Sequence, residues 1–197
     1  MSTDRRWDQR GFVIEESATS NGGKRTIFVE TMSPGTTVPP HFHTRFSETL
    51  DLVKGSMKVY KTDQPDLEKL EASAQTLQIG NPKIVEPLMY HRYTVEDEVT
   101  ALRVTLTPGD LGFEQILKIM IGLADDKELE KYGDDVILMG VFYELADTHL
   151  IGSTKKMIED LHATRGSEIR ALKTELLDRY DTEEALRKLL SPTPKTL

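Results

Sequence analysis

The sequence predicts a mainly β fold followed by helices, because two different hydrophobic periodicities divide the chain. From about Gly11 to Pro108 the segments are short, rich in Val, Ile, Thr, Tyr and Phe, and interrupted by Gly and Pro, a pattern typical of strands and turns. After Pro108 the apolar residues recur at helical spacing. We therefore expect a strand domain over residues 1–110 and a helical extension over residues 111–197, packed on that domain or on a partner subunit.

Within the first part, two turn signals each predict a hairpin: Asn21-Gly22-Gly23 and Lys54-Gly55. The expected strands cover residues 12–14, 26–29, 50–53, 57–60, 77–79, 84–85, 93–95 and 101–106. Alternation in the last of these puts Leu102, Val104 and Leu106 on one face, which predicts that they point into a core.

The second part reads as three helical segments. The first runs from Phe113 to Ala124, and the second starts at Asp134-Asp135, where acids suit a helix N-terminus. Its first two turns are apolar nearly all round, so we expect it to be buried against the strand domain or a second subunit. Residues 167–190 are expected to form one or two exposed helices with a break at Asp181-Thr182, ended by residues 191–194.

Composition excludes several classes of function. The net charge of −8 and the lack of a basic run argue against a nucleic-acid partner. The absence of cysteine excludes disulfides and thiolate metal sites. The longest apolar stretch, Val136 to Tyr143, is far below the ~18 residues of a membrane span, and the first residues lack the apolar core of a signal peptide. We expect a cytoplasmic protein without a membrane partner.

Four side chains in the strand part form a candidate metal site. His41 and His43 are separated by one residue, so both imidazoles project from the same face of an extended strand. Glu48 begins the next strand, in phase with Leu50, and His91 begins another. Paired histidines alone are more often surface residues. Two neutral imidazoles on one face are a natural start for a first-row transition-metal site.

The residues between Gly35 and Gly55 resemble the first motif of the cupin family, G(X)5HXH(X)4E(X)6G, at every fixed position. The second cupin motif, G(X)5PXG(X)2H(X)3N, is matched more loosely by Gly80, Pro87 and His91. Pro87 falls one place late, Met89 replaces the inner glycine, and Val95 replaces the final asparagine. The turn before His91 is therefore expected to differ from that of the family.

The resemblance covers about residues 25–107 and implies a double-stranded β-helix, a jelly-roll barrel whose sheet closes on itself, followed by C-terminal α-helices. It also implies one divalent ion, Fe, Mn, Ni, Zn or Cu, held by His41, His43, Glu48 and His91. The helical half resembles the tail of a subset of small bacterial cupins, where helices pack on the barrel exterior. A homodimer is expected, since small cupins commonly associate and Val136 to Tyr143 offers apolar surface.

Two classes of function fit this site. The first is a metal-dependent, dioxygenase-like oxidoreductase for a small organic substrate, or else a sugar or keto-acid isomerase, with Glu48 as a possible base. The second is a ligand-binding or sensing module without turnover. Arg45 and Tyr93 are candidates for the substrate pocket, whereas His149 and His162 are expected to be ordinary histidines of the helical half.

Overall fold

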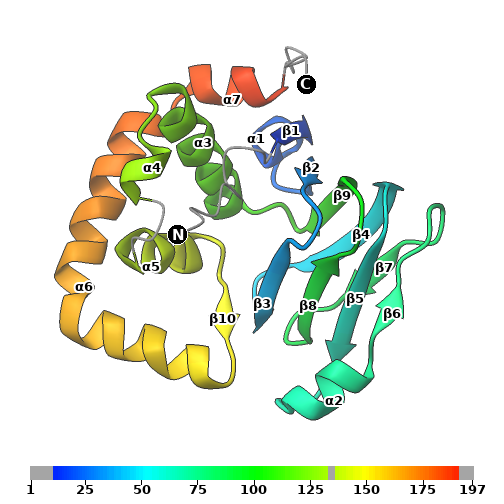
Figure 1. Ribbon diagram of the computed structural model, residues 1–197. Helices are drawn as coiled ribbons and strands as arrows, with labels where there is room; N and C mark the ends of the chain where they lie inside the picture. The colour runs from blue at the N-terminus through cyan, green and yellow to red at the C-terminus, as the bar shows by residue number, and fades with distance from the viewer. Residues whose placement is uncertain (1–10, 133–135, 191–197) are drawn as a thin grey trace.

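The computed structural model describes residues 11–132 and 136–190, and its strands form two five-stranded antiparallel sheets (Figure 1). The first sheet has the order β1 (Gly11–Glu16), β2 (Thr26–Met32), β9 (Thr100–Thr107), β4 (Ser47–Lys54) and β7 (Lys83–Val85). The second has the order β10 (His149–Leu150), β3 (Thr37–Phe42), β8 (Tyr90–Val95), β5 (Met57–Thr62) and β6 (Gln75–Thr76). The expectation of one closed sheet is wrong. The edge strands β6, β7 and β10 have only two or three residues each, too few to join one sheet to the other.

The chain alternates between the two sheets from β2 to β5, so that β4 and β5 lie in different sheets. The hairpin expected at Lys54-Gly55 is therefore wrong, whereas β1 and β2 do pair as expected around Asn21-Gly22-Gly23. Gly55 has φ +95° and passes so close to Thr100 that an added Cβ would lie 2.3 Å from its Oγ1. This glycine carries the chain across from one sheet to the other, beside the start of β9.

The inner faces of the sheets hold the first hydrophobic core. Leu102, Val104 and Leu106 are buried, which confirms the face predicted from their alternation. Leu50 from β4 and Met57 from β5 are buried in the same core and come from opposite sheets. The candidate site lies among these inward-facing positions.

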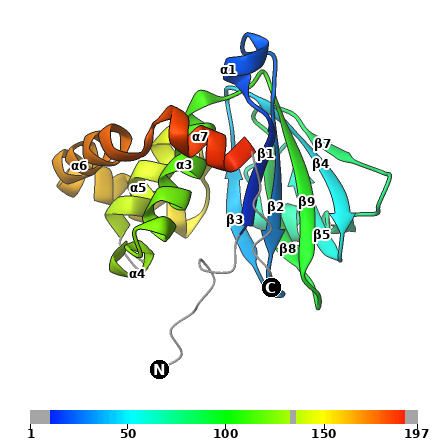
Figure 2. The same cartoon turned by 90° about the horizontal axis from the view of Figure 1, so that it is seen from above.

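The helices α3 to α7 lie on one side of the sheets, whereas α2 lies beside β5 (Figures 1 and 2). The long helices are α3 (Leu111–Asp125), α5 (Val136–Leu145), α6 (Ser153–Tyr180) and α7 (Glu183–Leu190), and the short ones are α1 (Ala18–Asn21), α2 (Leu67–Ala72) and α4 (Leu129–Tyr132). The expected start at Asp134-Asp135 and the end over residues 191–194 lie outside the described residues. None of the helices in the described ranges is long and apolar enough to cross a membrane.

The helices enclose a second core of their own. Ile119, Val141 and Ile169, from α3, α5 and α6, are all buried in it. The burial expected for α5 is confirmed, but its main contacts are with α6 and α3 rather than with the strands. The break at Asp181-Thr182 is confirmed by the Thr182 hydroxyl, which accepts a hydrogen bond from the Ala185 amide. The domain division at residue 110 stays a prediction, and β10 joins a sheet from within the helical half.

The turn before His91 departs from the cupin pattern at a different residue from the one expected. Leu88, not Met89, adopts the left-handed conformation that glycine favours, with φ +69°. Counted from Gly80, Leu88 also stands at the inner-glycine position of the motif. The Leu88 amide donates a hydrogen bond to the His43 carbonyl at 2.7 Å. The strained turn is therefore bonded to the residue that directly follows β3.

Candidate metal centre

The four predicted side chains converge between the sheets. His41 lies on β3 directly opposite His91 on β8, His43 follows the end of β3, and Glu48 projects from β4. All four residues are buried, and one ligand atom from each lies within 4.8 Å of the others. Two strands of one sheet and one strand of the other therefore meet at this point.

The hydrogen bonds of the three imidazoles fix which ring nitrogen carries the proton. His41 Nδ1 lies 2.7 Å from the Pro39 carbonyl oxygen, and His91 Nδ1 lies 3.0 Å from that of Met89. His43 Nδ1 lies 3.0 Å from the carbonyl oxygen of Asp147. Because a carbonyl oxygen only accepts, each Nδ1 must donate, and in a neutral ring each Nε2 then carries a lone pair.

These lone pairs face one another. His41 Nε2 and His43 Nε2 are 3.1 Å apart, and His91 Nε2 lies 3.0 Å from a carboxylate oxygen of Glu48. Among the described residues, His91 Nε2 is a buried nitrogen without a hydrogen-bond partner. Acceptors packed together in a buried place repel one another unless a cation lies between them. The donor set therefore fits a metal ion.

The protonation states agree with this geometry. Burial, together with the neighbouring imidazoles of His91 and His43, holds the pKa of His41 well below its ordinary value, and burial also lowers the pKa of His43. Burial alone would raise the pKa of Glu48, but the imidazoles of His43 and His91 outweigh it and lower that pKa. Neutral imidazoles and an ionised carboxylate are the forms that bind metals.

A short segment of the helical half supports the site, and sequence reasoning missed it. The carbonyls of Ala146 and Asp147 both accept from His43 Nδ1. The Asp147 carboxylate accepts from the backbone amides of Thr44 and Arg45, at 2.6 and 2.8 Å. Immediately beyond, β10 pairs with Phe42 and His41. More than 100 residues separate Asp147 from His43, and no motif or periodicity in the sequence indicates the contact.

The two candidate pocket residues make contacts of their own. The Arg45 guanidinium pairs with Asp110 at 2.9 Å and donates to the Leu145 carbonyl. The Tyr93 hydroxyl donates to Glu30 at 3.2 Å. A role for Arg45 or Tyr93 in binding a substrate stays a prediction.

One side of the site is apolar. The Phe46 ring packs against the His43 ring with centroids 4.6 Å apart, and it meets the Phe113 ring at an interplanar angle of 88°. Phe46 is fully buried. Such a wall excludes water from the region next to the imidazoles and favours organic over ionic ligands.

Comparison with known proteins gives only distant likenesses. No family model and no curated protein matches the chain. Among solved structures, KdgF from Halomonas sp. aligns with a TM-score of 0.42 and 13% identity over 55% of this chain and 84% of its own. L-ribose isomerase from Cellulomonas parahominis aligns with a TM-score of 0.41 and 14% identity, over 50% of this chain and 60% of its own. The DMSP lyase DddQ from Ruegeria pomeroyi DSS-3 aligns with a TM-score of 0.36 and 19% identity, over 45% of this chain and 40% of its own. At these values the likenesses establish neither a family nor an activity.

Proposed function

We propose that this chain is a jelly-roll protein of the cupin type. It binds one divalent metal ion through His41, His43, Glu48 and His91, and it is an enzyme that uses this ion in catalysis. The strand orders β2-β9-β4-β7 and β3-β8-β5-β6 support the first part, because a jelly roll places eight strands in two such sheets. β1 and β10 extend the sheets at their edges.

The convergence of three imidazole lone pairs and one carboxylate in a buried place carries the proposal. In a surface cluster of acids or histidines, water would screen the repulsion between the side chains. These four side chains are buried away from water, so their repulsion is not screened. With no thiolate present, the donor set suits Fe(II), Mn(II), Ni(II), Zn(II) or Cu(II).

The finer proposal is a dioxygenase-like oxidoreductase acting on a small organic molecule. His41, His43, Glu48 and His91 would hold the ion, and a redox-active ion would supply Lewis acidity and one-electron chemistry to a substrate and dioxygen. In this scheme the three imidazoles would hold the ion, Phe46 keeps water away, and the ionised Glu48, a ligand able to detach, would accept a proton from the substrate.

Two alternatives use the same ligands. In an isomerase of sugars or keto acids, Glu48 moves a proton next to a polarised carbonyl and no oxygen is consumed. In a binding or sensing module, the same site holds a ligand without turnover. The expected homodimer is also a proposal, which sedimentation equilibrium of the full chain tests.

The experiment begins with the metal content of the full-length protein after purification, followed by chelation and reconstitution with each of the five metals. Oxygen uptake is then measured with catechols and 1,3-diketones, and solvent deuterium incorporation with aldoses and keto acids. Metal-dependent oxygen uptake supports the dioxygenase-like reading, and deuterium incorporation without it supports the isomerase. If the protein holds less than a stoichiometric amount of metal after reconstitution, the proposal as a whole is contradicted.

A further inference from the structure

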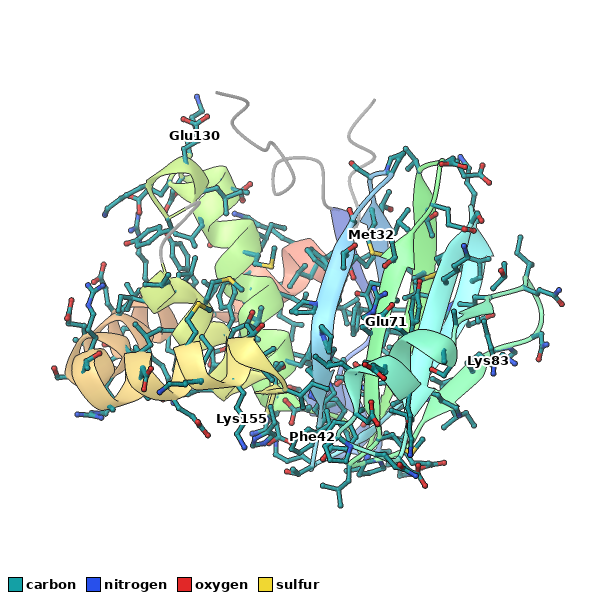
Figure 3. The ribbon with its side chains drawn as sticks, turned by 60° about the horizontal axis from the view of Figure 1, so that its bottom comes forward. Met32, Phe42, Glu71, Lys83, Glu130 and Lys155 are labelled. Atoms are coloured by element: carbon teal, nitrogen blue, oxygen red, sulfur yellow. The ribbon has the colours of Figure 1, made fainter. Side chains whose placement is uncertain are left out.

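A cavity of about 570 Å³ lies behind the candidate metal centre, between the start of α6 and the edge of the second sheet. Its walls include Phe42 on β3, Tyr90 on β8, His149 on β10 and Lys155 on α6. In Figure 3, Phe42 and Lys155 lie near one another at the lower edge of the molecule. The volume is in the range of small-molecule sites, and none of the four candidate metal ligands contributes to it.

One wall of this cavity is built from flat rings. The Phe42 ring stacks on His149, with centroids 4.9 Å apart and an interplanar angle of 17°. Tyr90 meets the same Phe42 ring edge-on at 5.2 Å. Ile158, from the second turn of α6, adds an aliphatic side chain to the lining. A planar apolar body fits such a wall better than a flexible chain does.

The polar groups of the cavity include hydroxyls, which can donate hydrogen bonds to an anion, and one ammonium group. The hydroxyls of Tyr90, Tyr143 and Thr148 make no hydrogen bond with another described residue. Burial raises the pKa of Tyr143, so its phenol keeps the proton and can donate. The exposed Lys155 ammonium adds a positive charge at the rim.

The acids of the wall already have cationic partners. Glu144 accepts from Lys173 at 2.8 Å and lies 3.5 Å from His162. Glu159 lies 3.7 Å from Lys155 in an exposed pair, and the ammonium, which has three N–H groups, keeps donors for a ligand anion. An anionic group on a ligand could accept hydrogen bonds from the cavity hydroxyls and from the Lys155 ammonium.

We propose that this cavity is a second binding site, separate from the metal centre, for a small aromatic molecule that carries an anionic group. The rings of Phe42, Tyr90 and His149 receive the aromatic body, and Lys155 with the free hydroxyls receives the anion. Phe42 lies between His41 and His43 in sequence and points to the opposite face of β3, so the two sites lie back to back.

The test uses 1-anilinonaphthalene-8-sulfonate, an aromatic anion, titrated into the full-length protein and followed by fluorescence and calorimetry. Saturable binding at one site is expected, with the same affinity before and after chelation of metals. Ile158→Trp fills the cavity and is expected to weaken binding at least tenfold. Met157→Trp is the matched control, because the neighbouring Met157 is 52% exposed and does not line the cavity.

Equal binding by the Ile158→Trp variant and the parent would overturn the proposal, as would unsaturable binding. Lys155→Gln provides an independent variant at an exposed position that has no role in the cores. It is expected to weaken the sulfonate several-fold while leaving the uncharged probe N-phenyl-1-naphthylamine unaffected. Unchanged sulfonate binding contradicts the anion site even if the tryptophan variant fails to fold.

Discussion

The strand half (residues 11–107) and the helical half (residues 111–190) contribute to the candidate metal centre in different ways. The strand half supplies every candidate ligand, each placed by its position on or beside a strand. The helical half supplies acceptors instead: the carbonyls of Ala146 and Asp147 hold His43 Nδ1, and the Asp147 carboxylate holds the bend after it. The helical half thus orients one candidate ligand, His43, whereas carbonyls of the strand half, Pro39 and Met89, orient His41 and His91.

The largest expected effect comes from removing a ligand. His43→Ala should reduce the metal content from one ion per chain to almost none. The three remaining ligands should bind the ion at least ~100-fold more weakly than the four ligands of the parent do. Elemental analysis after desalting measures this, and far-ultraviolet circular dichroism confirms that the variant folds. His162→Ala, at a histidine of α6 that pairs with Glu144, should keep its metal. Equal metal in the His43→Ala variant and the parent contradicts the assignment of the strand half as ligand donor.

Much of the strand half could be predicted because its signals are local. Alternation alone placed His41 and His43 on one face, and the burial of Leu102, Val104 and Leu106 followed from the same rule. The convergence of Glu48 and His91 with them required a motif, since nothing local relates β4 to β8. The motif did not reveal which sheet each strand joins.

The missed features depend on contacts between distant residues. β10 has two residues and is a strand only because it pairs with Phe42 and His41. The first half of α6, residues 153–166, has only three large apolar side chains, Met157, Ile158 and Leu161, too short a stripe to mark it as helix. Asp147 adopts φ +52°, a conformation that its sequence neighbours do not indicate. Its role is fixed by the fold rather than by the surrounding residues.

Within the strand half, the two glycines that bound the first motif should differ in their sensitivity to a methyl group. Gly35 has φ +76° and open space around it, so Gly35→Ala should cost about 1 kcal/mol, from the left-handed backbone alone. Gly55 has φ +95°, and an added Cβ would lie 2.6 Å from the Thr100 backbone, so Gly55→Ala should cost ~3 kcal/mol or more. Urea unfolding measures both. Similar costs would contradict a tight crossing between the sheets at Gly55.

A buried carboxylate ties the two halves together and offers the next test. Glu114 on α3 is 1% exposed and accepts hydrogen bonds of 2.7 Å from the Ser17 hydroxyl, the Ala18 amide and the Thr26 hydroxyl. Glu114→Ala leaves these donors buried without an acceptor and should cost about 3 kcal/mol of unfolding free energy. Glu130→Ala, at an exposed position of α4, is the control and should change it by less than ~0.5 kcal/mol.

The mode of unfolding sharpens the comparison between the halves. If the Glu114 contacts couple them, helical circular dichroism and hydrogen exchange of the strand amides should report one shared transition that moves to lower urea in the Glu114→Ala variant. If the helical transition of the variant moves to lower urea while the transition of the strand half stays unchanged, the strand half is instead stable without the helical half.

The smallest expected effect tests whether the helical half orients the ligand that it contacts. Asp147→Ala removes the acceptor of the Thr44 and Arg45 amides but leaves the backbone carbonyl that His43 uses. His43 should remain a ligand with a less fixed ring, so metal affinity should fall by about 10- to 100-fold rather than being abolished. Competition with a chromophoric chelator measures the affinity, and the electronic spectrum of the Co(II) form should shift with the ligand geometry.

Asp147→Asn separates orientation from local stability, because asparagine tolerates the left-handed backbone at φ +52° and keeps one acceptor oxygen. It should therefore retain more affinity than Asp147→Ala and a spectrum closer to that of the parent. If both variants lose stability but keep parental affinity and spectrum, the segment from Ala146 to Leu150 only fastens the helices to the sheet. In that case the strand half would orient its ligands by itself.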